Sequence, residues 1–389
     1  MAAPTDRPLL ILFANSLWNL ANFRGGLIVA LRQAGYRVEV AGPVGALTPS
    51  QAILLGPVEL MPLRSEAIDP LTDMRLTRDM AAMLKRRRPA AVLSFTPKPN
   101  IYGAIAARVT GVPAVPNVSG LGSAFLGGGV LRRVVSGLYR LAFARAPAVF
   151  FQNPDDRDLF VTRRLVRAEQ ARLLPGSGVD CDRFAPRPRS TTADGAVRFL
   201  FVGRLLAQKG LRELIDAIRI VRMTRPQARF ALLGPLGGAN RSAIGQSELD
   251  GWIAEGLVEY LGAVDDVRPH LAGADAVILP SWREGLPRSL LEAAAMGRPL
   301  IASDVPGCRE IVRDGVNGLL HEVRSAAAIA AALTRFCELP SEARAAMGAA
   351  SRRIALDEYG EQRVIDAYLA VLARIAPLPI PLAVDADAR

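Results

Sequence analysis

The sequence predicts an α/β protein of two domains, each a doubly wound parallel sheet, that face a central crevice. At 389 residues the chain is too long for one compact core. Short runs rich in Val, Ile, Leu and Phe alternate with helical patterns along its length, which is typical of βαβ units. This alternation is interrupted once, in residues 185–196. Because such sheets bind ligands beyond the carboxyl ends of their strands, we expect the functional site in the crevice.

The first half of the chain contains five short apolar runs that predict strands. The predicted strands are Leu9–Ala14, Arg37–Ala41, Ala91–Ser94, Ala114–Val118 and Ala148–Phe151. Helices are expected between them, because parallel strands must be joined by crossover connections. The first domain is predicted to cover residues 1–184.

Residues 185–196, with the sequence APRPRSTTADGA, are predicted to form the linker between the domains. They lack hydrophobic periodicity and are rich in Pro, Arg, Ser and Thr. After them, the runs VRFLFVGR, ARFALLG, VEYLGA, DAVILP and RPLIAS predict the strands of a second domain over residues 197–376. The Pro- and Ala-rich residues 377–389 are predicted to be a loose tail.

The composition argues against several classes of protein. No run approaches the roughly 20 consecutive apolar residues that a membrane-spanning helix needs, and the apolar run Leu9–Ala14 is expected to be a strand and not part of a signal peptide. The three cysteines are far apart in the sequence, which is typical of a reducing compartment, so we expect a cytoplasmic protein. No His, Cys and Asp cluster has metal-site spacing, and we expect no metal cofactor.

The net charge of +11 lies entirely in the first half of the chain. Residues 1–195 contain 25 Lys and Arg against 14 Asp and Glu, whereas residues 196–389 contain 23 of each kind. Such a surface attracts polyanions, either nucleic acid or anionic lipid headgroups. Aromatic residues make up only 6% of the chain and do not alternate with basic residues, which argues against nucleic acid.

One candidate anion site follows the first strand of the second domain, in the sequence GRLLAQKG. It places Gly203, Arg204, Lys209 and Gly210 in the turn before a helix. Two cations beside the amides at a helix start suit a diphosphate. An ordinary glycine turn with solvated basic side chains explains the same residues equally well.

A second candidate site is the sequence EGLPRSLLE, which carries two carboxylates eight residues apart, Glu284 and Glu292. Glu284 would lie in the loop after a strand and accept hydrogen bonds from sugar hydroxyls, beside the amides of Gly285 and Leu286. Pro287 suits the first turn of the following helix. Glu292 lies among Ala and Leu residues, so we expect it to be partly buried and to need donors such as ribose hydroxyls.

Structural roles explain each of these two carboxylates as well. Glu292 could form a salt bridge with Arg288, four residues earlier, and Glu284 could interact only with the helix dipole. Taken singly, either structural role is favoured over the functional one.

In the first half, two loops offer polar groups. Gly25 and Gly26 are expected between the first strand and the first helix. They could belong to a phosphate or sugar site, or they could form a plain turn. Lys98 follows the strand that ends at Ser94, between two prolines that stiffen its loop, which is unusual for a merely solvated lysine. Residues 130–146 repeat apolar residues at helical spacing among arginines, so this helix either lies in a membrane interface or packs against the core.

Together these segments resemble glycosyltransferase family 4, retaining sugar-nucleotide transferases of the GT-B fold, which has two Rossmann-like domains. The resemblance is strongest in GRLLAQKG, in GAVDD and in the run EGLPRSLLEAAAMGRPLIASDVPGCREIVRDGVNGLL. The first-half segments TPKPNIYG and NVSGLGSAF resemble bacterial members that extend lipid-linked saccharides for capsule, O-antigen or glycoprotein glycans.

The resemblance implies a role for each candidate residue. Arg204 and Lys209 would hold the diphosphate of the donor, Glu284 the donor sugar and Glu292 the ribose. The glycine loop of the first domain would correspond to Gly25 and Gly26, and that domain would bind the acceptor. The remaining donor-site positions are Gly203, Gly234 and Val264, the last two near the nucleobase, and Gly285, Leu286 and Pro287 near the phosphates.

The resemblance implies transfer of a hexose or N-acetylhexosamine from a nucleoside diphosphate sugar to a polyprenyl-diphosphate-linked saccharide. Among the possible donors, a UDP-sugar is the one we expect. The enzyme would work without metal, on the inner face of the cytoplasmic membrane, held there peripherally by its basic half. Many family members carry a histidine where this chain has Thr96, Pro97 and Lys98. The resemblance therefore makes Lys98 a candidate catalytic residue that would steady either the donor phosphates or the acceptor, in place of the histidine. The alternatives are a sugar-nucleotide 2-epimerase of the same fold and a non-catalytic basic protein that binds membranes or nucleic acid.

Overall fold

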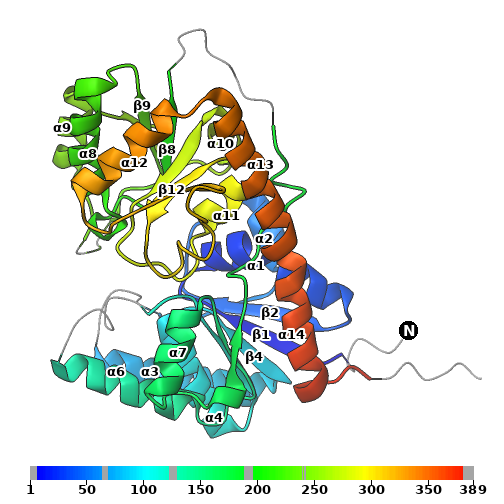
Figure 1. The fold of residues 1–389 in the computed structure, drawn as a ribbon. Coiled ribbons are helices and arrows are strands. Elements are labelled where there is room, and N and C mark those ends of the chain that lie inside the picture. Colours follow the sequence, from blue (N-terminus) through cyan, green and yellow to red (C-terminus); the bar gives the residue numbers. More distant parts are fainter. Residues whose placement is uncertain are drawn as a thin grey trace, which may run out of the picture. The chain divides into compact units, whose positions relative to one another are not determined.

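The computed structural model describes residues 7–63, 69–121, 129–187, 196–238, 240 and 242–379. These form two compact units, each built on one parallel sheet (Figure 1). Unit 1 comprises residues 1–152, 156–174 and 362–389, and unit 2 comprises residues 153–155 and 175–361. The division departs from the expected bounds in two places: the long segment of unit 2 begins at Pro175, and the helix that follows Glu361 belongs to unit 1 and not to the second domain. Residues 188–195 of the expected linker and 380–389 of the expected tail lie outside the described residues.

Unit 1 is a seven-stranded parallel sheet with the order β3-β2-β1-β4-β5-β6-β7. Its strands are β1 (Leu9–Phe13), β2 (Arg37–Gly42), β3 (Val58–Leu60), β4 (Ala91–Ser94), β5 (Ala114–Val118), β6 (Val149–Phe151) and β7 (Ala171–Leu173). Its helices are α1 (Leu17–Gln33), α2 (Pro49–Leu55), α3 (Pro70–Arg87), the π-helix η1 (Pro99–Gly103), α4 (Ala104–Thr110), α6 (Gly129–Phe143), α7 (Pro154–Thr162), the 3-10 turn η2 (Ala168–Gln170) and α14 (Glu361–Ile375).

Unit 2 is a six-stranded parallel sheet with the order β10-β9-β8-β11-β12-β13. Its strands are β8 (Arg198–Val202), β9 (Arg229–Leu233), β10 (Glu259–Tyr260), β11 (Ala276–Leu279), β12 (Leu300–Ser303) and β13 (Gly318–His321). Its helices are the 3-10 turn η3 (Ala207–Lys209), α8 (Leu211–Thr224), α9 (Gln246–Ala254), α10 (Arg268–Gly273), α11 (Arg288–Ala295), α12 (Ala326–Glu338) and α13 (Ser341–Glu358). Both sheets have the doubly wound order in which the strand sequence reverses beside the first strand, which confirms the predicted fold class.

Continuous apolar strands explain why both faces of each sheet are covered. Along β1, Leu9 and Ile11 contribute to one hydrophobic core of unit 1, and Leu10 and Leu12 contribute to the other. This follows from the two-residue repeat of a strand, which points successive side chains to opposite faces. The sheet is therefore buried on both sides.

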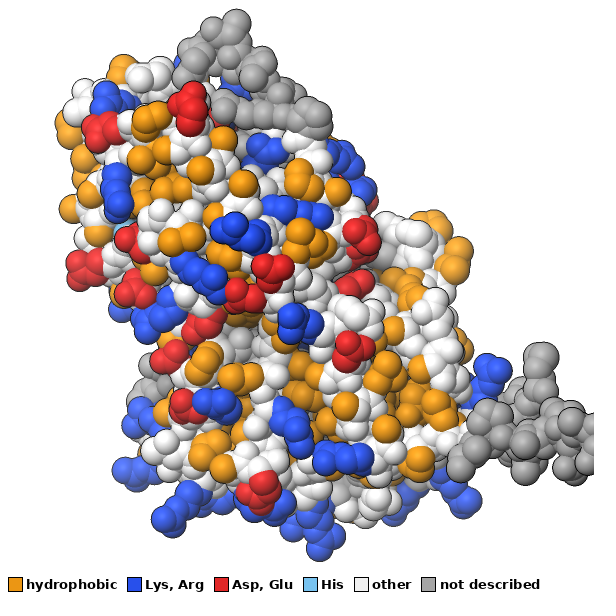
Figure 2. All heavy atoms as spheres, turned by 45° about the vertical axis from the view of Figure 1, so that its right-hand side comes forward, with side chains coloured by type: hydrophobic (Ala, Val, Ile, Leu, Met, Phe, Trp, Pro, Cys, Tyr) orange, Lys and Arg blue, Asp and Glu red, His pale blue; other side chains and the backbone are white. Residues whose placement is uncertain are grey.

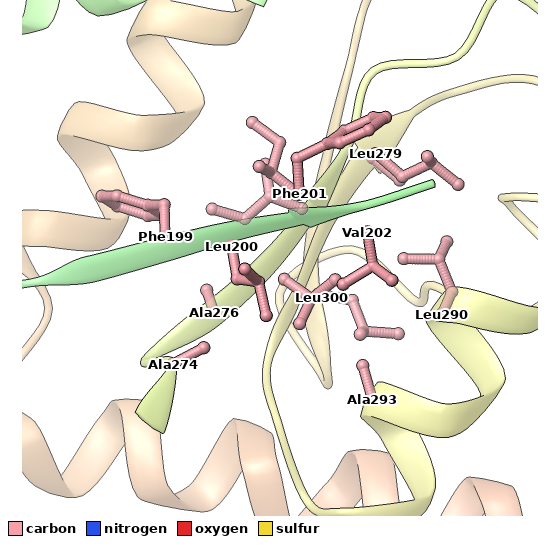
Figure 3. Close-up of a cluster of buried hydrophobic side chains, with 14 of the residues drawn as sticks. Phe199, Leu200, Phe201, Val202, Ala274, Ala276, Leu279, Leu290, Ala293 and Leu300 are labelled. Atoms are coloured by element: carbon pink, nitrogen blue, oxygen red, sulfur yellow. The ribbon is translucent and has the colours of Figure 1, made fainter. Parts of the chain in front are cut away.

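In unit 2, the strand β8 sets the position of helix α11. Figure 3 shows Phe201 on one side of β8 and Val202 on the other, where Val202 faces Leu290 and Ala293 of α11. Leu290 and Ala293 are completely buried, so the apolar face of α11 is held against the sheet. This packing fixes where the remaining residues of α11 lie.

The helix α14 joins unit 1 because its apolar face completes one of the cores there. Tyr368 is fully buried, and its ring centroid lies 4.7 Å from that of Phe150 in β6. Asn117 of β5 donates a hydrogen bond of 3.0 Å to the Tyr368 hydroxyl group. Burial raises the pKa of Tyr368 to about 12.

Candidate functional site

The carboxyl ends of the strands of unit 2 bring together several of the predicted residues. Gly203 follows β8 and Gly234 follows β9, and the Gly203 amide donates to the Leu233 carbonyl oxygen at 2.9 Å. A Cβ atom on Gly234, which has a φ of 138°, would lie 2.1 Å from the Gly203 carbonyl oxygen. These two backbone segments approach so closely that only glycine fits at position 234.

The central feature of this edge is an ion pair between Lys209 and Glu284. Lys209 Nζ lies 2.5 Å from Glu284 Oε1, and the two side chains are 21% and 12% exposed. Lys209 ends the turn η3 just before α8, and Glu284 lies in the loop between β11 and α11. The tertiary structure thus joins two candidate residues that the sequence separates by 75 positions.

Backbone contacts fasten the Glu284 loop to the turn that carries Lys209. The Trp282 amide donates to the Gln208 carbonyl oxygen at 3.0 Å. Gly210 has a φ of 74°, and a Cβ atom there would lie 2.0 Å from the Pro280 carbonyl oxygen. The ion pair is therefore held by the two loops themselves, with Gly210 as the residue that permits their contact.

A second set of contacts holds the other side of the Glu284 loop. The Glu284 amide donates to the Pro306 carbonyl oxygen at 3.3 Å, and Asn153 Nδ2 donates to the Gly285 carbonyl oxygen at 2.7 Å. The Gly307 amide donates to the Glu310 carboxylate at 2.6 Å. Burial, reinforced by the nearby charge of Asp155, raises the pKa of Glu310.

Glu292 is buried on α11 and paired with Arg288. Arg288 Nε lies 2.9 Å from Glu292 Oε1, and the two side chains are 14% and 13% exposed. Burial raises the pKa of the Glu292 carboxyl group, although Arg288 acts in the opposite direction. Arg288 also donates to Ser177 Oγ at 3.2 Å and to the Gly178 carbonyl oxygen at 3.1 Å. The salt bridge expected as the structural role of Glu292 is therefore present.

The other predicted donor-site residues differ in their exposure and in their hydrogen bonds. Arg204 is exposed, and none of the described residues forms an ion pair with it. Leu286 is buried with its side chain in the core, and Pro287 is the N-cap residue of α11. Within the described part of the chain, the amide hydrogens of Gly285 and Leu286 have no acceptor. Val264 is 37% exposed.

Lys98 lies in unit 1 and is bound to an acid that the sequence analysis did not single out. Lys98 Nζ lies 2.7 Å from Asp73 Oδ1, and the Tyr102 hydroxyl group donates to Asp73 Oδ2 at 2.8 Å. Burial, followed by the contact with Asp73, raises the pKa of Tyr102. Asp73 stands in the first turn of α3, where an acid is usually explained by the helix dipole, so the sequence carried no signal of this contact.

The prediction that Gly25 and Gly26 lie in a loop is wrong. Both residues lie inside α1, which starts after Ser16, whose side chain accepts a hydrogen bond from the Asn19 amide. A Cβ atom on Gly25 would lie 3.0 Å from Leu54 Cδ2, so the close packing of α1 against α2 accounts for this glycine. These two glycines therefore belong to a helix and not to a loop between β1 and α1.

The basic surface of unit 1 is partly neutralised. Arg86 Nη2 lies 2.5 Å from Glu59 Oε1, and Arg87 forms an ion pair with Glu39. Arg132 and Arg133 of α6 are exposed. Figure 2 shows Lys and Arg side chains gathered along the lower edge of that view.

The helix α6 packs against the core with its last turns and exposes apolar side chains in its first turns. In its last turns Tyr139 and Phe143 are buried with Phe160 in an aromatic cluster. In its first turns Val130 is 72% exposed and Val134 is 53% exposed. No helix in the described ranges is long and apolar enough to cross a membrane. Among the described residues no group of three His, Cys, Asp or Glu side chains could hold a metal ion.

Two family models match the chain. Residues 21–177 match a glycosyl transferase 4-like domain, and residues 196–338 match the glycosyl transferases group 1 domain. The chain is a GT-B glycosyltransferase of the family 4 type. The two matched domains of this glycosyltransferase correspond in order to the two parallel sheets.

Individual proteins are similar to this glycosyltransferase over most of its length. It is 26% identical over 323 residues to N,N'-diacetylbacillosaminyl-diphospho-undecaprenol alpha-1,3-N-acetylgalactosaminyltransferase of Campylobacter jejuni, with 79% of this chain and 84% of the relative covered. It is 25% identical over 286 residues to UDP-Gal:alpha-D-GlcNAc-diphosphoundecaprenol alpha-1,3-galactosyltransferase of Escherichia coli, covering 71% and 73%. In fold it is similar to HepE of Anabaena, solved in complex with UDP-glucose, with a TM-score of 0.76, 21% identity and coverage of 95% and 100%.

Proposed function

We propose that this glycosyltransferase transfers a hexose or N-acetylhexosamine from a UDP-sugar to a polyprenyl-diphosphate-linked saccharide, with retention of configuration, in the assembly of a bacterial surface glycan. The observation that carries the proposal is the Lys209–Glu284 pair, fixed by backbone contacts at the carboxyl edge of the unit 2 sheet. The names of the two relatives, which state a diphospho-undecaprenol-linked sugar as substrate, support the class of acceptor.

The pair suggests how the donor would bind. A donor diphosphate brings negative charge that competes with the Glu284 carboxylate for Lys209, so Lys209 would turn to the diphosphate together with Arg204. The released Glu284 carboxylate would then accept hydrogen bonds from hydroxyl groups of the sugar. The free amides of Gly285 and Leu286 would add donors to the phosphate oxygens.

The nucleoside would lie behind the sugar. Glu292 would accept hydrogen bonds from the ribose hydroxyl groups, and Arg288 would keep its carboxylate ionised despite burial. The base would lie near Gly234 and Val264, beside Gly203.

In the proposed reaction the bond between sugar C1 and the diphosphate oxygen breaks. The oxygen of the acceptor hydroxyl group bonds to C1 on the same face, and its proton passes to the departing phosphate. Lys209 and Arg204 stabilise the negative charge that develops on the leaving diphosphate, which is where preorganised cations lower a barrier most.

The acceptor implies that the enzyme works at a membrane surface. The exposed Arg132 and Arg133 of α6, together with the exposed apolar side chains of Val130 and Val134, suit a surface of anionic lipids. We propose that unit 1 makes this peripheral contact on the cytoplasmic side, where nucleotide sugars are supplied.

The test is a donor and acceptor screen with purified protein. UDP-, GDP- and ADP-sugars are each incubated with polyprenyl-diphosphate-linked mono- and disaccharides, and the released nucleoside diphosphate is measured. We expect release from a UDP-sugar only when the acceptor is present, and a product with the anomeric configuration of the donor by NMR. If no donor released its nucleoside diphosphate with any acceptor, the proposal would be wrong.

A further inference from the structure

A groove of about 1050 Å³ runs between three helices of unit 1. One face of each helix lines it: Thr77 and Ala81 from α3, Ile101 and Ile105 from η1 and α4, and Val135 and Leu138 from α6. The helices α3, α4 and α6 are neighbours in the structure (Figure 1). Most of the lining is apolar, and an apolar groove of this size on a surface usually marks a binding site.

One end of the groove is polar. Asn15 and Lys98, which follow β1 and β4 at the carboxyl edge of the sheet, both line it. Asp73 and Tyr102 line the same end and hold Lys98 through the contacts of 2.7 Å and 2.8 Å described above. The groove then follows α3 from Asp73 to Lys85, a helical distance of about 18 Å.

The charges around the groove favour an anion. Its lining contains the cations Arg78, Lys85 and Lys98 and one acid, Asp73, which is already bound to Lys98. The exposed Arg132 and Arg133 belong to α6, the helix that forms one wall. A ligand with a negative head and a long apolar tail is complementary to such a site.

We propose that this groove binds the first isoprene units of the polyprenyl chain of the acceptor, with the acceptor diphosphate at the polar end beside Lys98 and Tyr102. The inference rests on the proposed function and names the part of the protein that recognises the lipid. Asp73 is a positioning residue, since it orients the Lys98 ammonium and the Tyr102 hydroxyl group toward one place. The saccharide would then start at the carboxyl edge of the sheet, where ligands of such folds bind.

The first experiment asks what occupies the groove without relying on catalysis. The full-length protein is irradiated with a diazirine-bearing farnesyl diphosphate, and the labelled peptides are identified by mass spectrometry. We expect labels on α3, α4 and α6, suppressed by unlabelled farnesyl diphosphate and not by inorganic diphosphate. Labels confined to other helices would overturn the inference.

The second experiment narrows the groove with Ala82→Trp, because Ala82 is exposed and lines it. The matched control is Ala52→Trp, an exposed alanine on α2. The indole ring should displace a few methylene groups of the polyprenyl chain from the groove, so KM for the polyprenyl-linked acceptor should rise about tenfold in Ala82→Trp. In Ala52→Trp this KM should be unchanged. KM for the UDP-sugar should stay the same in both, as should KM for an acceptor with a short alkyl group in place of the lipid.

These results separate failure of the inference from failure of the proposed function. If wild-type protein transfers sugar to the lipid-linked acceptor and the two Trp variants have equal KM values, the groove inference is wrong and the function stands. If Ala82→Trp instead weakens binding to phosphatidylglycerol vesicles while the acceptor KM is unchanged, the occupant is a bilayer phospholipid, and the inference is overturned. If wild-type protein transfers nothing but the label maps to the groove, the lipid site stands and the proposed reaction falls.

Discussion

At the scale of single residues, the two carboxylates of EGLPRSLLE lie in different environments. Glu284 pairs with a lysine from another loop, and Glu292 pairs with an arginine one turn earlier on its own helix. A ligand with a diphosphate can compete for Lys209 with little rearrangement, because the pair is at the edge of the sheet. The two carboxylates are about equally buried, but Arg288 is also held by Ser177 and Gly178.

Glu284→Gln should mainly slow transfer. A hydrogen bond to a charged group contributes roughly 1.5–3 kcal/mol, so its loss corresponds to a fall in kcat of about 10- to 100-fold. Steady-state kinetics with the UDP-sugar and the lipid-linked acceptor measure this. Glu259→Gln, an exposed glutamate on β10, is the control. A wild-type kcat in Glu284→Gln would contradict the assigned role.

Glu292→Gln should mainly weaken nucleotide binding. If the carboxylate holds the ribose, its neutral replacement should raise Kd for UDP by about tenfold or more, measured by calorimetry. The kcat at saturating donor should change less than in Glu284→Gln. An unchanged Kd would leave Glu292 with the salt bridge to Arg288 as its whole role.

The burial of Glu292 also predicts a pH dependence of stability. Its pKa is raised in the folded protein above the ordinary value of about 4.3, so between these two pKa values the folded state binds more protons than the unfolded state. The contribution of Glu292 to stability is therefore largest at low pH and falls as pH rises from about 4. We expect Glu292→Gln to gain stability relative to wild type over the same range, measured by urea unfolding at several pH values. A difference that does not vary with pH would contradict this.

At the scale of elements, the loops after β8, β11 and β12 hold one another through backbone contacts that require glycine. Gly210 meets the Pro280 carbonyl group, and Gly307 has a φ of 88° and would place a Cβ atom 2.7 Å from the Gly285 carbonyl oxygen. The Glu284 loop is thus fastened on two sides, which preorganises its carboxylate.

Gly210→Ala should destabilise unit 2 and lower activity. The left-handed conformation costs about 1–2 kcal/mol for alanine, and the clash with the Pro280 carbonyl group adds to this. Gly315→Ala is a matched control, because Gly315 has nearly the same φ, 73°, and nothing within 4 Å of its added Cβ atom. Thermal unfolding should show a clearly larger loss for Gly210→Ala. Equal losses in the two variants would show that the loop contact contributes nothing.

At the scale of the whole molecule, the excess positive charge of the first half is partly used within unit 1. The pairs Arg86–Glu59 and Arg87–Glu39 neutralise part of the run that ends α3. Arg132 and Arg133 of α6 are exposed, and they stand beside the exposed apolar side chains of Val130 and Val134.

Arg132→Glu with Arg133→Glu should weaken binding to vesicles that contain phosphatidylglycerol. Each basic residue near an anionic surface contributes about 1 kcal/mol, so reversing two should lower the partition coefficient by more than about tenfold at low salt. The double variant Arg353→Glu with Arg363→Glu makes the same change in net charge at exposed sites on α13 and α14. A vesicle sedimentation assay compares them. Equal loss in both double variants would mean that net charge alone, and not α6, determines binding.

The sequence alone determined the α/β class and the central strands. The strands Ala91–Ser94 and Ala114–Val118 were predicted with the bounds that β4 and β5 have, because a strand buried on both faces is a continuous apolar run. The edge strands Val58–Leu60 and Ala171–Leu173 were missed, since they are short and partly exposed and so lack such a run. The local pair Arg288 and Glu292 was also foreseen from its four-residue spacing on a helix.

Only the tertiary structure decided which distant residues meet. Nothing in the local sequence pairs Lys209 with Glu284 or Lys98 with Asp73, because those contacts depend on how the loops after parallel strands converge. The role of Gly25 also depends on tertiary packing. In the sequence this glycine suggested a loop, but in the structure it allows α1 to approach Leu54 of α2 closely. Hydrophobic periodicity is a property of residues that are close in the sequence, so it predicts helices and strands. A contact between two such elements depends on how the whole sheet packs, which the local sequence does not determine.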